Sequence, residues 1–149
     1  MARYAVQANR TASTTASLGT VGADATRPRR GKFYDLIFGS EASAADNPFL
    51  YIVQRCTALG TSTSVTPQPL DPADAATEAD AGENHTIEPT YTANAVLLAI
   101  ALNQRATFRW VAPPGGELVY PATASNGLGI QTPTSSAVAI SATIHVEEQ

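Results

Sequence analysis

The sequence predicts an all-β fold, an antiparallel β-sandwich of about eight strands with an extended N-terminal arm and one short acidic helix. Short runs rich in Val, Ile, Thr and aromatic residues recur at spacings of about 8–12 residues, the pattern of a sandwich or barrel. Ten glycines and ten prolines punctuate these runs as turn residues do. No internal repeat and no coiled-coil heptad competes with this interpretation.

The composition indicates a single domain over residues 1–149 with a neutral, hydroxyl-rich surface. Hydrophobic residues make up 44% of the chain and charged residues only 15%, against roughly 25% in typical soluble domains. The formal net charge of −4 argues against a nucleic-acid partner, because phosphate neutralisation needs clustered cations. No apolar run approaches the roughly 18 residues that span a bilayer, and no signal-peptide core is visible. We therefore expect neither a membrane partner nor export by the usual route.

The N-terminal region is predicted to form one strand and then an arm. Residues 4–8 alternate between apolar and polar side chains, which is typical of a half-buried strand. Residues 9–31 lose this alternation and are expected to form a loop or extended arm, with one weak strand at Thr20 and Val21. Four of the nine Lys and Arg residues of the chain gather around the end of this arm, at Arg27, Arg29, Arg30 and Lys32.

Two dense strands follow, over residues 32–39 and 49–60, and the rest of the chain is expected to assemble on them. The connection between them carries Gly, Ser, Asp, Asn and Pro, so we expect consecutive neighbours near the middle of one sheet. The single cysteine, Cys56, lies in the second strand and is predicted to be a buried, unreactive side chain.

The middle of the chain is predicted to be peripheral. Residues 61–66 are β-prone but polar on both faces, as in an edge strand. Residues 67–85 form an acidic insertion, in which Asp71 caps a short helix with Pro72 in its first turn. Asp74, Glu78 and Asp80 complete a negative segment opposite the basic one.

The C-terminal half supplies the remaining strands. Residues 86–92 form a Pro-interrupted strand, at an edge or a bulge. Residues 95–102, whose length and composition would also allow a helix, are predicted to be a strand buried on both sides, and residues 105–111 and 117–120 a hairpin. The last strand, residues 137–146, alternates most regularly. In jelly rolls the first and last strands commonly pair, so we place residues 4–8 beside it and expect a jelly-roll type.

Tests for chemistry predict no enzyme. The chain has no Gly-x-Ser-x-Gly or His-Glu-x-x-His motif. Two histidines and one cysteine argue against a metal site, and we expect no catalytic residue and no cofactor. Asp71 and Asp74 have the spacing to share a cation, but a helix cap explains Asp71 better.

The opposed charges are the candidate partner contacts. A basic segment could grip an acidic surface, and an acidic segment could meet the basic segment of another copy. The alternative is a solvated loop whose arginine stems cover apolar surface. The candidate contact residues are Arg27, Arg29, Arg30, Lys32, Asp71, Asp74, Glu78 and Asp80.

Four strings resemble those of small virion proteins encoded beside major capsid genes in tailed bacteriophages. They are Phe33-Tyr-Asp-Leu-Ile-Phe-Gly-Ser40, Ala45-Asp-Asn-Pro48, Arg105-Ala-Thr-Phe-Arg-Trp-Val-Ala112 and Glu117-Leu-Val-Tyr-Pro-Ala-Thr-Ala124. These proteins are similar to capsid cement or decoration proteins. The resemblance implies a jelly-roll module, made in the host cytoplasm, that assembles on the outside of a capsid, often as a trimer, and contacts the major capsid protein.

The expected function is therefore that of a non-enzymatic structural component of the virion that stabilises the shell. One alternative is a lectin-like sandwich in which Tyr34, Tyr51, Trp110 and Tyr120 open onto one face as a glycan platform, although alternation favours a core position for Trp110. Another is a tail or head-completion protein of a phage.

Overall fold

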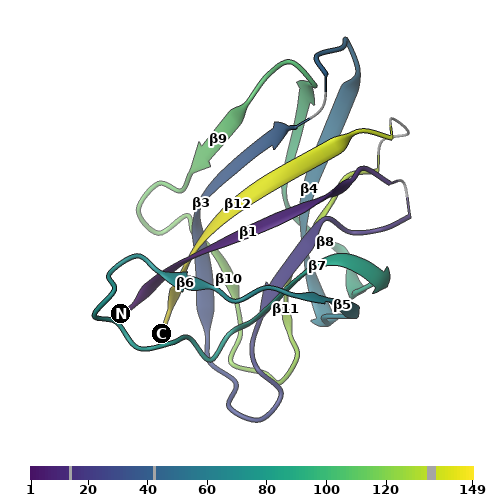
Figure 1. The fold of residues 1–149 in the computed structure, drawn as a ribbon. Coiled ribbons are helices and arrows are strands. Elements are labelled where there is room, and N and C mark those ends of the chain that lie inside the picture. Colours follow the sequence, from purple (N-terminus) through teal and green to yellow (C-terminus); the bar gives the residue numbers. More distant parts are fainter. Residues whose placement is uncertain (14, 42, 134–136) are drawn as a thin grey trace.

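The computed structural model describes residues 1–13, 15–41, 43–133 and 137–149. Two antiparallel sheets of six strands each face one another as a β-sandwich (Figure 1). No helix occurs in these ranges. Both termini lie close together at one end, where the amide of Glu148 donates to the carbonyl of Ala2 over 3.1 Å. The all-β sandwich predicted from the sequence is confirmed.

The first sheet contains the two ends of the chain. Its strand order is β10-β3-β12-β1-β6, and β9 also pairs with β3. The strands are β1 (Arg3–Thr11), β3 (Gly31–Ser40), β6 (Gln68–Pro69), β9 (Phe108–Val111), β10 (Leu118–Tyr120) and β12 (Ala139–Glu148).

The second sheet has the order β5-β7-β2-β11-β4-β8. Its strands are β2 (Gly19–Gly22), β4 (Pro48–Ala58), β5 (Thr61–Ser64), β7 (Asp80–Ile87), β8 (Thr90–Asn103) and β11 (Gly127–Gln131). The predicted edge strand over residues 61–66 is β5, and it does lie at an edge.

The core fills the space between the sheets with alternate side chains from each strand. Val6 of β1 and Ile144 of β12 are opposite one another and fully buried. Across the interface, the rings of Phe38 and Tyr51 lie 4.7 Å apart, centroid to centroid. The predicted pairing of the first and last strands is therefore confirmed, because both strands turn their regular apolar face inward. Cys56 is buried, as predicted.

The expected arm contains a central strand. β2 lies between β7 and β11, and all four of its residues are buried. Glycine makes this close approach possible. A Cβ on Gly22 would lie 2.6 Å from the carbonyl oxygen of Asn126. The weak strand predicted at Thr20 and Val21 is therefore a central strand, which fits between its neighbours because its glycines have no side chain.

Two expected strand arrangements are wrong. The strands predicted over residues 32–39 and 49–60 are not neighbours, because β3 and β4 lie in opposite sheets. Residues 105–111 and 117–120 do not form a hairpin, because β9 and β10 both pair with β3, one after the other along the same edge. The Pro-Pro-Gly-Gly turn between them lets the chain continue along β3 instead of folding back on itself.

The strand over residues 95–102 is not buried on both sides. It belongs to β8, the edge strand of the second sheet, where Val96 is 47% exposed. Leu98, Ile100 and Leu102 pack partly buried against the core, whereas Ala99 and Ala101 are exposed, so apolarity alone gave a false sign of burial on both faces.

The short acidic helix over residues 71–80 is also wrong. The Asp71 carboxylate accepts from the amide of Ala73, and the Asp71 carbonyl accepts from the amide of Asp74, which closes a single turn. After this turn residues 75–79 form no regular element, and the hydroxyl of Tyr4 donates to the carbonyl of Ala75 over 2.9 Å. A helix of ten residues is marginal without an apolar face to bury, so these tertiary bonds prevail.

Candidate partner-contact surface

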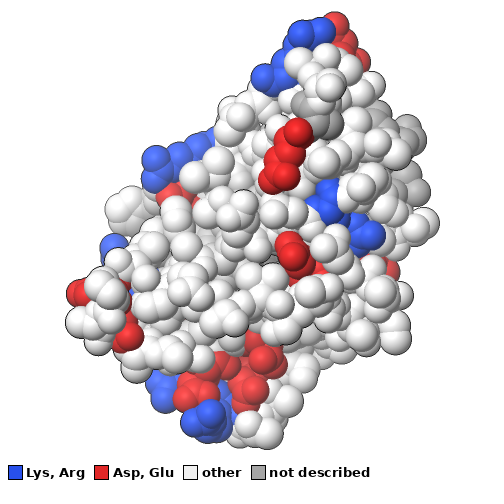
Figure 2. Space-filling model, in the orientation of Figure 1, with Lys and Arg blue, Asp and Glu red and all other residues white. Residues whose placement is uncertain are grey.

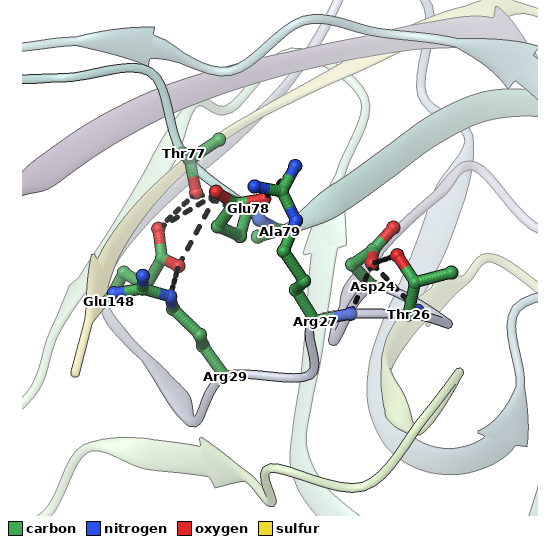
Figure 3. Close-up of polar contacts among 8 residues, drawn as sticks. All are labelled: Asp24, Thr26, Arg27, Arg29, Thr77, Glu78, Ala79 and Glu148. Atoms are coloured by element: carbon green, nitrogen blue, oxygen red, sulfur yellow. Dashed lines mark hydrogen bonds and ion pairs between the residues drawn. The ribbon is translucent and has the colours of Figure 1, made fainter.

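The basic segment begins with a tight loop held by Asp24. Its carboxylate accepts hydrogen bonds from the hydroxyl and amide of Thr26 and from the amide of Arg27, over 2.7, 2.8 and 2.6 Å. These bonds, that of the Thr26 hydroxyl first, lower the pKa of Asp24 to about 2. The loop directs Arg27 toward Glu78 (Figure 3). An Asx turn therefore fixes where the basic segment meets the acidic one.

The two predicted contact segments meet within one chain. Arg27 Nη2 lies 2.8 Å from Glu78 Oε2, and the Arg27 side chain is 72% exposed. Such an exposed pair adds little to stability. The ion pair matters for binding, because Arg27 and Glu78 neutralise each other and neither charge is then free to attract a second molecule.

Glu148, at the end of β12, connects three segments. Its carboxylate accepts from the hydroxyl of Thr77 and from the amide of Glu78, and it forms an ion pair with Arg29 over 3.5 Å (Figure 3). The Glu148 side chain is only 7% exposed. Since a buried carboxylate needs such partners, Glu148 holds the basic loop and the acidic segment against the first sheet.

Lys32 is paired on the outer face of the first sheet. Its ammonium lies 3.1 Å from Glu147 and 3.5 Å from Glu117, and Glu147 also contacts Arg3 over 3.1 Å. Burial opposes ionisation of Glu147, but the hydrogen bonds from Lys32 and Arg3 hold its pKa below the usual value. Lys32 is therefore part of a network of ion pairs within the chain.

The eight predicted contact residues thus divide into two groups. Arg27, Arg29, Lys32 and Glu78 form intrachain ion pairs. In the part of the chain that the structure describes, Arg30, Asp71, Asp74 and Asp80 form none. Some of the ion pairs expected between copies thus form within one chain. Only the second group of residues is left to contact partners.

The acidic turn, residues 70–74, projects from the molecule. The amide of Leu70 donates to the carbonyl of Arg3 over 2.8 Å, which anchors the start of the turn on β1. Leu70 is 52% exposed, and Asp71 and Asp74 are exposed as well. Figure 2 shows acidic side chains gathered on the loop that joins β6 to β7, at the left edge of a surface that is otherwise mostly uncharged.

A second charge network on the first sheet was not foreseen from the sequence. Arg109 binds both carboxylate oxygens of Asp35, over 2.9 and 2.7 Å, and Nδ1 of His145 lies 2.9 Å from the same carboxylate. The hydrogen bond from Arg109 holds the pKa of Asp35 below its usual range. The sequence could have indicated this network, because Asp35 is a single acid within a run of apolar strand residues. A carboxylate in that position needs a cation on a neighbouring strand.

A buried hydroxyl cluster beside the second sheet, formed by Ser17, Glu88 and Tyr91, was also missed. The Ser17 hydroxyl donates to Glu88 and lies 2.6 Å from the hydroxyl of Tyr91. Ser17 is fully buried, so no substrate reaches its oxygen. His85 falls within the acidic insertion predicted over residues 67–85, but it is buried on β7, and burial lowers its pKa. Ser17, Glu88 and Tyr91 thus satisfy one another as parts of the fold, and Nε2 of His85 lies 3.2 Å from both the Thr20 hydroxyl and the Leu59 carbonyl oxygen.

The aromatic residues considered as a glycan platform do not share an open face. Tyr51 and Tyr120 are in the core, with exposures of 1% and 0%. Trp110 packs partly buried against the same core. Tyr34 stacks on the ring of His145 at 5.9 Å and lies under the guanidinium of Arg3 at 5.2 Å. A sugar would have to displace these contacts to stack on Tyr34.

Comparisons with known proteins give no indication of function, so the functional argument depends on the geometry described above. No protein-family model, curated protein or solved structure matches the chain. Among the described residues, no group of three or more His, Cys, Asp and Glu side chains is placed to hold a metal ion. The same residues include no helix with the length and apolarity needed to cross a membrane.

Proposed function

We propose that the protein is a non-enzymatic structural component of a phage virion, which binds the outside of the capsid as an oligomer, with three copies as the resemblance implies, and stabilises the shell. The major capsid protein is its partner. The observation that carries this proposal is the nested pairing of the strands, which supports a jelly-roll fold.

The pairing runs inward from the two ends of the chain. β1 pairs with β12, β2 with β11, β3 with β10 and β4 with β8, each pair antiparallel. A long hairpin that is rolled up into two sheets has this arrangement, with β5, β6 and β7 inserted in the connection before β8. Jelly rolls are common in viral capsid proteins and in lectins. The fold type therefore supports a virion role without selecting it over a lectin.

The surface favours protein contact over glycan binding. The aromatic rings that would stack on a sugar lie in the core or in contact with charged side chains. Six of the nine Lys and Arg residues form ion pairs within the described chain. Much of the surface in Figure 2 is uncharged. Such a surface can lie against a shell with little desolvation of charge, and many copies on a lattice add avidity to weak single contacts.

Co-sedimentation and imaging of particles test the proposal. Purified protein should pellet with capsids that lack it, should saturate at a fixed ratio to the major capsid protein, and should raise the temperature at which the shells open. An unrelated β-sandwich of similar size serves as the control for trapping. Antibody to the protein should label the capsid exterior in electron micrographs.

The same images separate the alternatives. Label confined to the tail or to one vertex would replace the proposal with a tail or head-completion role. Protein that neither pellets with shells nor labels virions would refute a virion role. In that case, binding to a glycan array that Trp110→Ala abolishes without unfolding the protein would establish the lectin.

A further inference from the structure

A groove at one end of the sandwich is lined by arginine. It has a volume of about 410 Å³ and lies between β4, the turn before β11 and the segment after β10. Arg30 and Arg55 supply its charge, Val119 and Pro121 supply apolar wall, and the buried Cys56 also lines it. No acidic side chain is among the lining residues. We call this the arginine groove.

The cations of the groove are exceptional in this chain. Of the nine Lys and Arg residues, six form ion pairs with carboxylates: Arg3, Arg27, Arg29, Lys32, Arg105 and Arg109. Among the described residues, Arg10, Arg30 and Arg55 form none. Arg10 is occupied by the carbonyls of Thr11 and Ser17. Arg55 makes one long contact, 3.5 Å, with the carbonyl of Val119. The two cations without a carboxylate or a close acceptor thus line one groove.

The acidic turn has the complementary chemistry. Asp71 and Asp74 are exposed carboxylates with no ion pair in the described chain, and Leu70 beside them is an exposed apolar side chain. The turn is anchored at both sides, through Leu70 to Arg3 and through Ala75 to Tyr4. It is therefore presented as a fixed projection and is not free to fold back into the groove of its own chain.

We propose that the acidic turn of one copy docks into the arginine groove of a neighbouring copy. Asp71 and Asp74 pair with Arg30 and Arg55, and Leu70 packs against the apolar wall. This inference rests on the proposed function, since it assigns the surface through which the copies of the oligomer meet. The contact joins two different surfaces, so repetition of it closes a ring when the rotation permits, as in a trimer.

Charge gives this contact its specificity. Each copy carries a net charge of −4, so two copies repel unless complementary charges meet locally. Carboxylate and guanidinium form short, directional hydrogen bonds, and a groove with apolar walls excludes part of the water that would weaken them. Because the charges stay near the surface, added salt should weaken the association.

Charge exchange tests the proposal in solution, without capsids. Analytical ultracentrifugation should find a defined oligomer of the unaltered protein at low salt. The doubles R30E/R55E and D71R/D74R should each weaken association at least tenfold, whereas the quadruple variant, which restores opposite charges, should recover it. Arg105→Glu and Asp80→Arg, which reverse charges outside both surfaces, serve as controls and should change it little. Thermal unfolding of every variant checks that it folds. If R30E/R55E does not fold, the neutral double R30Q/R55Q replaces it.

Each contrary outcome has a defined meaning. A monomeric unaltered protein, doubles that associate normally, or a quadruple variant that stays dissociated would each overturn the contact. Doubles that keep the oligomer but no longer bind shells would assign the groove to the capsid protein and also overturn it. Salt-sensitive oligomers that obey the charge exchange but never bind shells would refute the proposed function and leave this inference standing.

Discussion

At the scale of single residues, the buried hydroxyl of Tyr120 lowers the stability of the core. The residue is fully buried, its hydroxyl has no hydrogen-bond partner among the described residues, and burial raises its pKa. Tyr120→Phe should therefore raise the free energy of unfolding, by about 1 kcal/mol, because it removes an unpaired polar group. Tyr51→Phe is the matched control, since the Tyr51 hydroxyl donates to the carbonyl of Gly39 over 3.0 Å.

The control should shift in the opposite direction. Tyr51→Phe removes one partner of a formed hydrogen bond and should lower the free energy of unfolding by about 1 kcal/mol. Urea unfolding of both variants measures the difference. Equal destabilisation by the two substitutions would mean that the Tyr120 hydroxyl has a partner after all.

Asp35 should make the stability depend on pH. Arg109 holds the folded-state pKa of Asp35 below the ordinary 3.8, so the folded protein binds this proton less readily than the unfolded chain. The stabilisation is thus present above pH of about 4 and is lost as the pH falls through the folded-state pKa. Asp35→Asn should be less stable at pH 7 and should lose less stability on acidification than the unaltered protein.

Urea unfolding at pH 7, 5 and 3 measures this effect. Asp46→Asn is the control, because Asp46 pairs with Arg105 through a carboxylate that is 76% exposed. That control should follow the pH curve of the unaltered protein. An Asp35→Asn curve parallel to it would show that Arg109 and His145 do not favour the ionised form.

At the scale of elements, strands are predictable from the sequence wherever one face is dry along their whole length. β12 alternates through Ile140, Ala142, Ile144 and Val146, all fully buried, and its partner β1 does the same. β8 misled because its apolar residues lie at an edge. Alternation reports which side chains share a face, but it does not report what covers that face, so pairing and burial had to come from the fold.

The connection between β6 and β7 is held by Glu148, and this element gives a third prediction. Glu148→Ala removes the acceptor for the Thr77 hydroxyl and the Glu78 amide, so the free energy of unfolding should fall by about 1–3 kcal/mol. Hydrogen exchange at the Glu78 amide should accelerate. Glu78→Ala, which removes only the exposed pair with Arg27, should do neither to a comparable degree. Unchanged exchange in Glu148→Ala would show that other contacts hold the segment.

At the scale of the whole molecule, the candidate contact surface was only half predictable. The sequence states which residues are charged, and the basic and acidic segments were visible in it. It does not state distances, so Arg27 and Glu78 were assigned to different molecules although they form an ion pair within one. Arg55 was not considered at all, because it joins Arg30 only when the two sheets meet.

The nested strand order also sets how the chain folds. β1 and β12 pair across nearly the full length of the chain, and proteins with such non-local pairing fold slowly, in milliseconds to seconds. A circular permutant that joins residue 149 to residue 1 by a short glycine linker makes this pair a local hairpin. New ends placed in the turn at residues 113–116, where Gly115 is exposed at φ +81°, interrupt no strand.

The permutant should keep the fold and refold several-fold faster than the parent chain, because closing the β1–β12 pair then costs less loop entropy. Stopped-flow refolding by tryptophan fluorescence, with Trp110 as the single probe, measures both rates. The parent chain carrying the same linker as a tail controls for the linker itself. An unchanged rate in a correctly folded permutant would mean that this pair forms after the rate-limiting step, and the slow step would then lie in the docking of the two sheets.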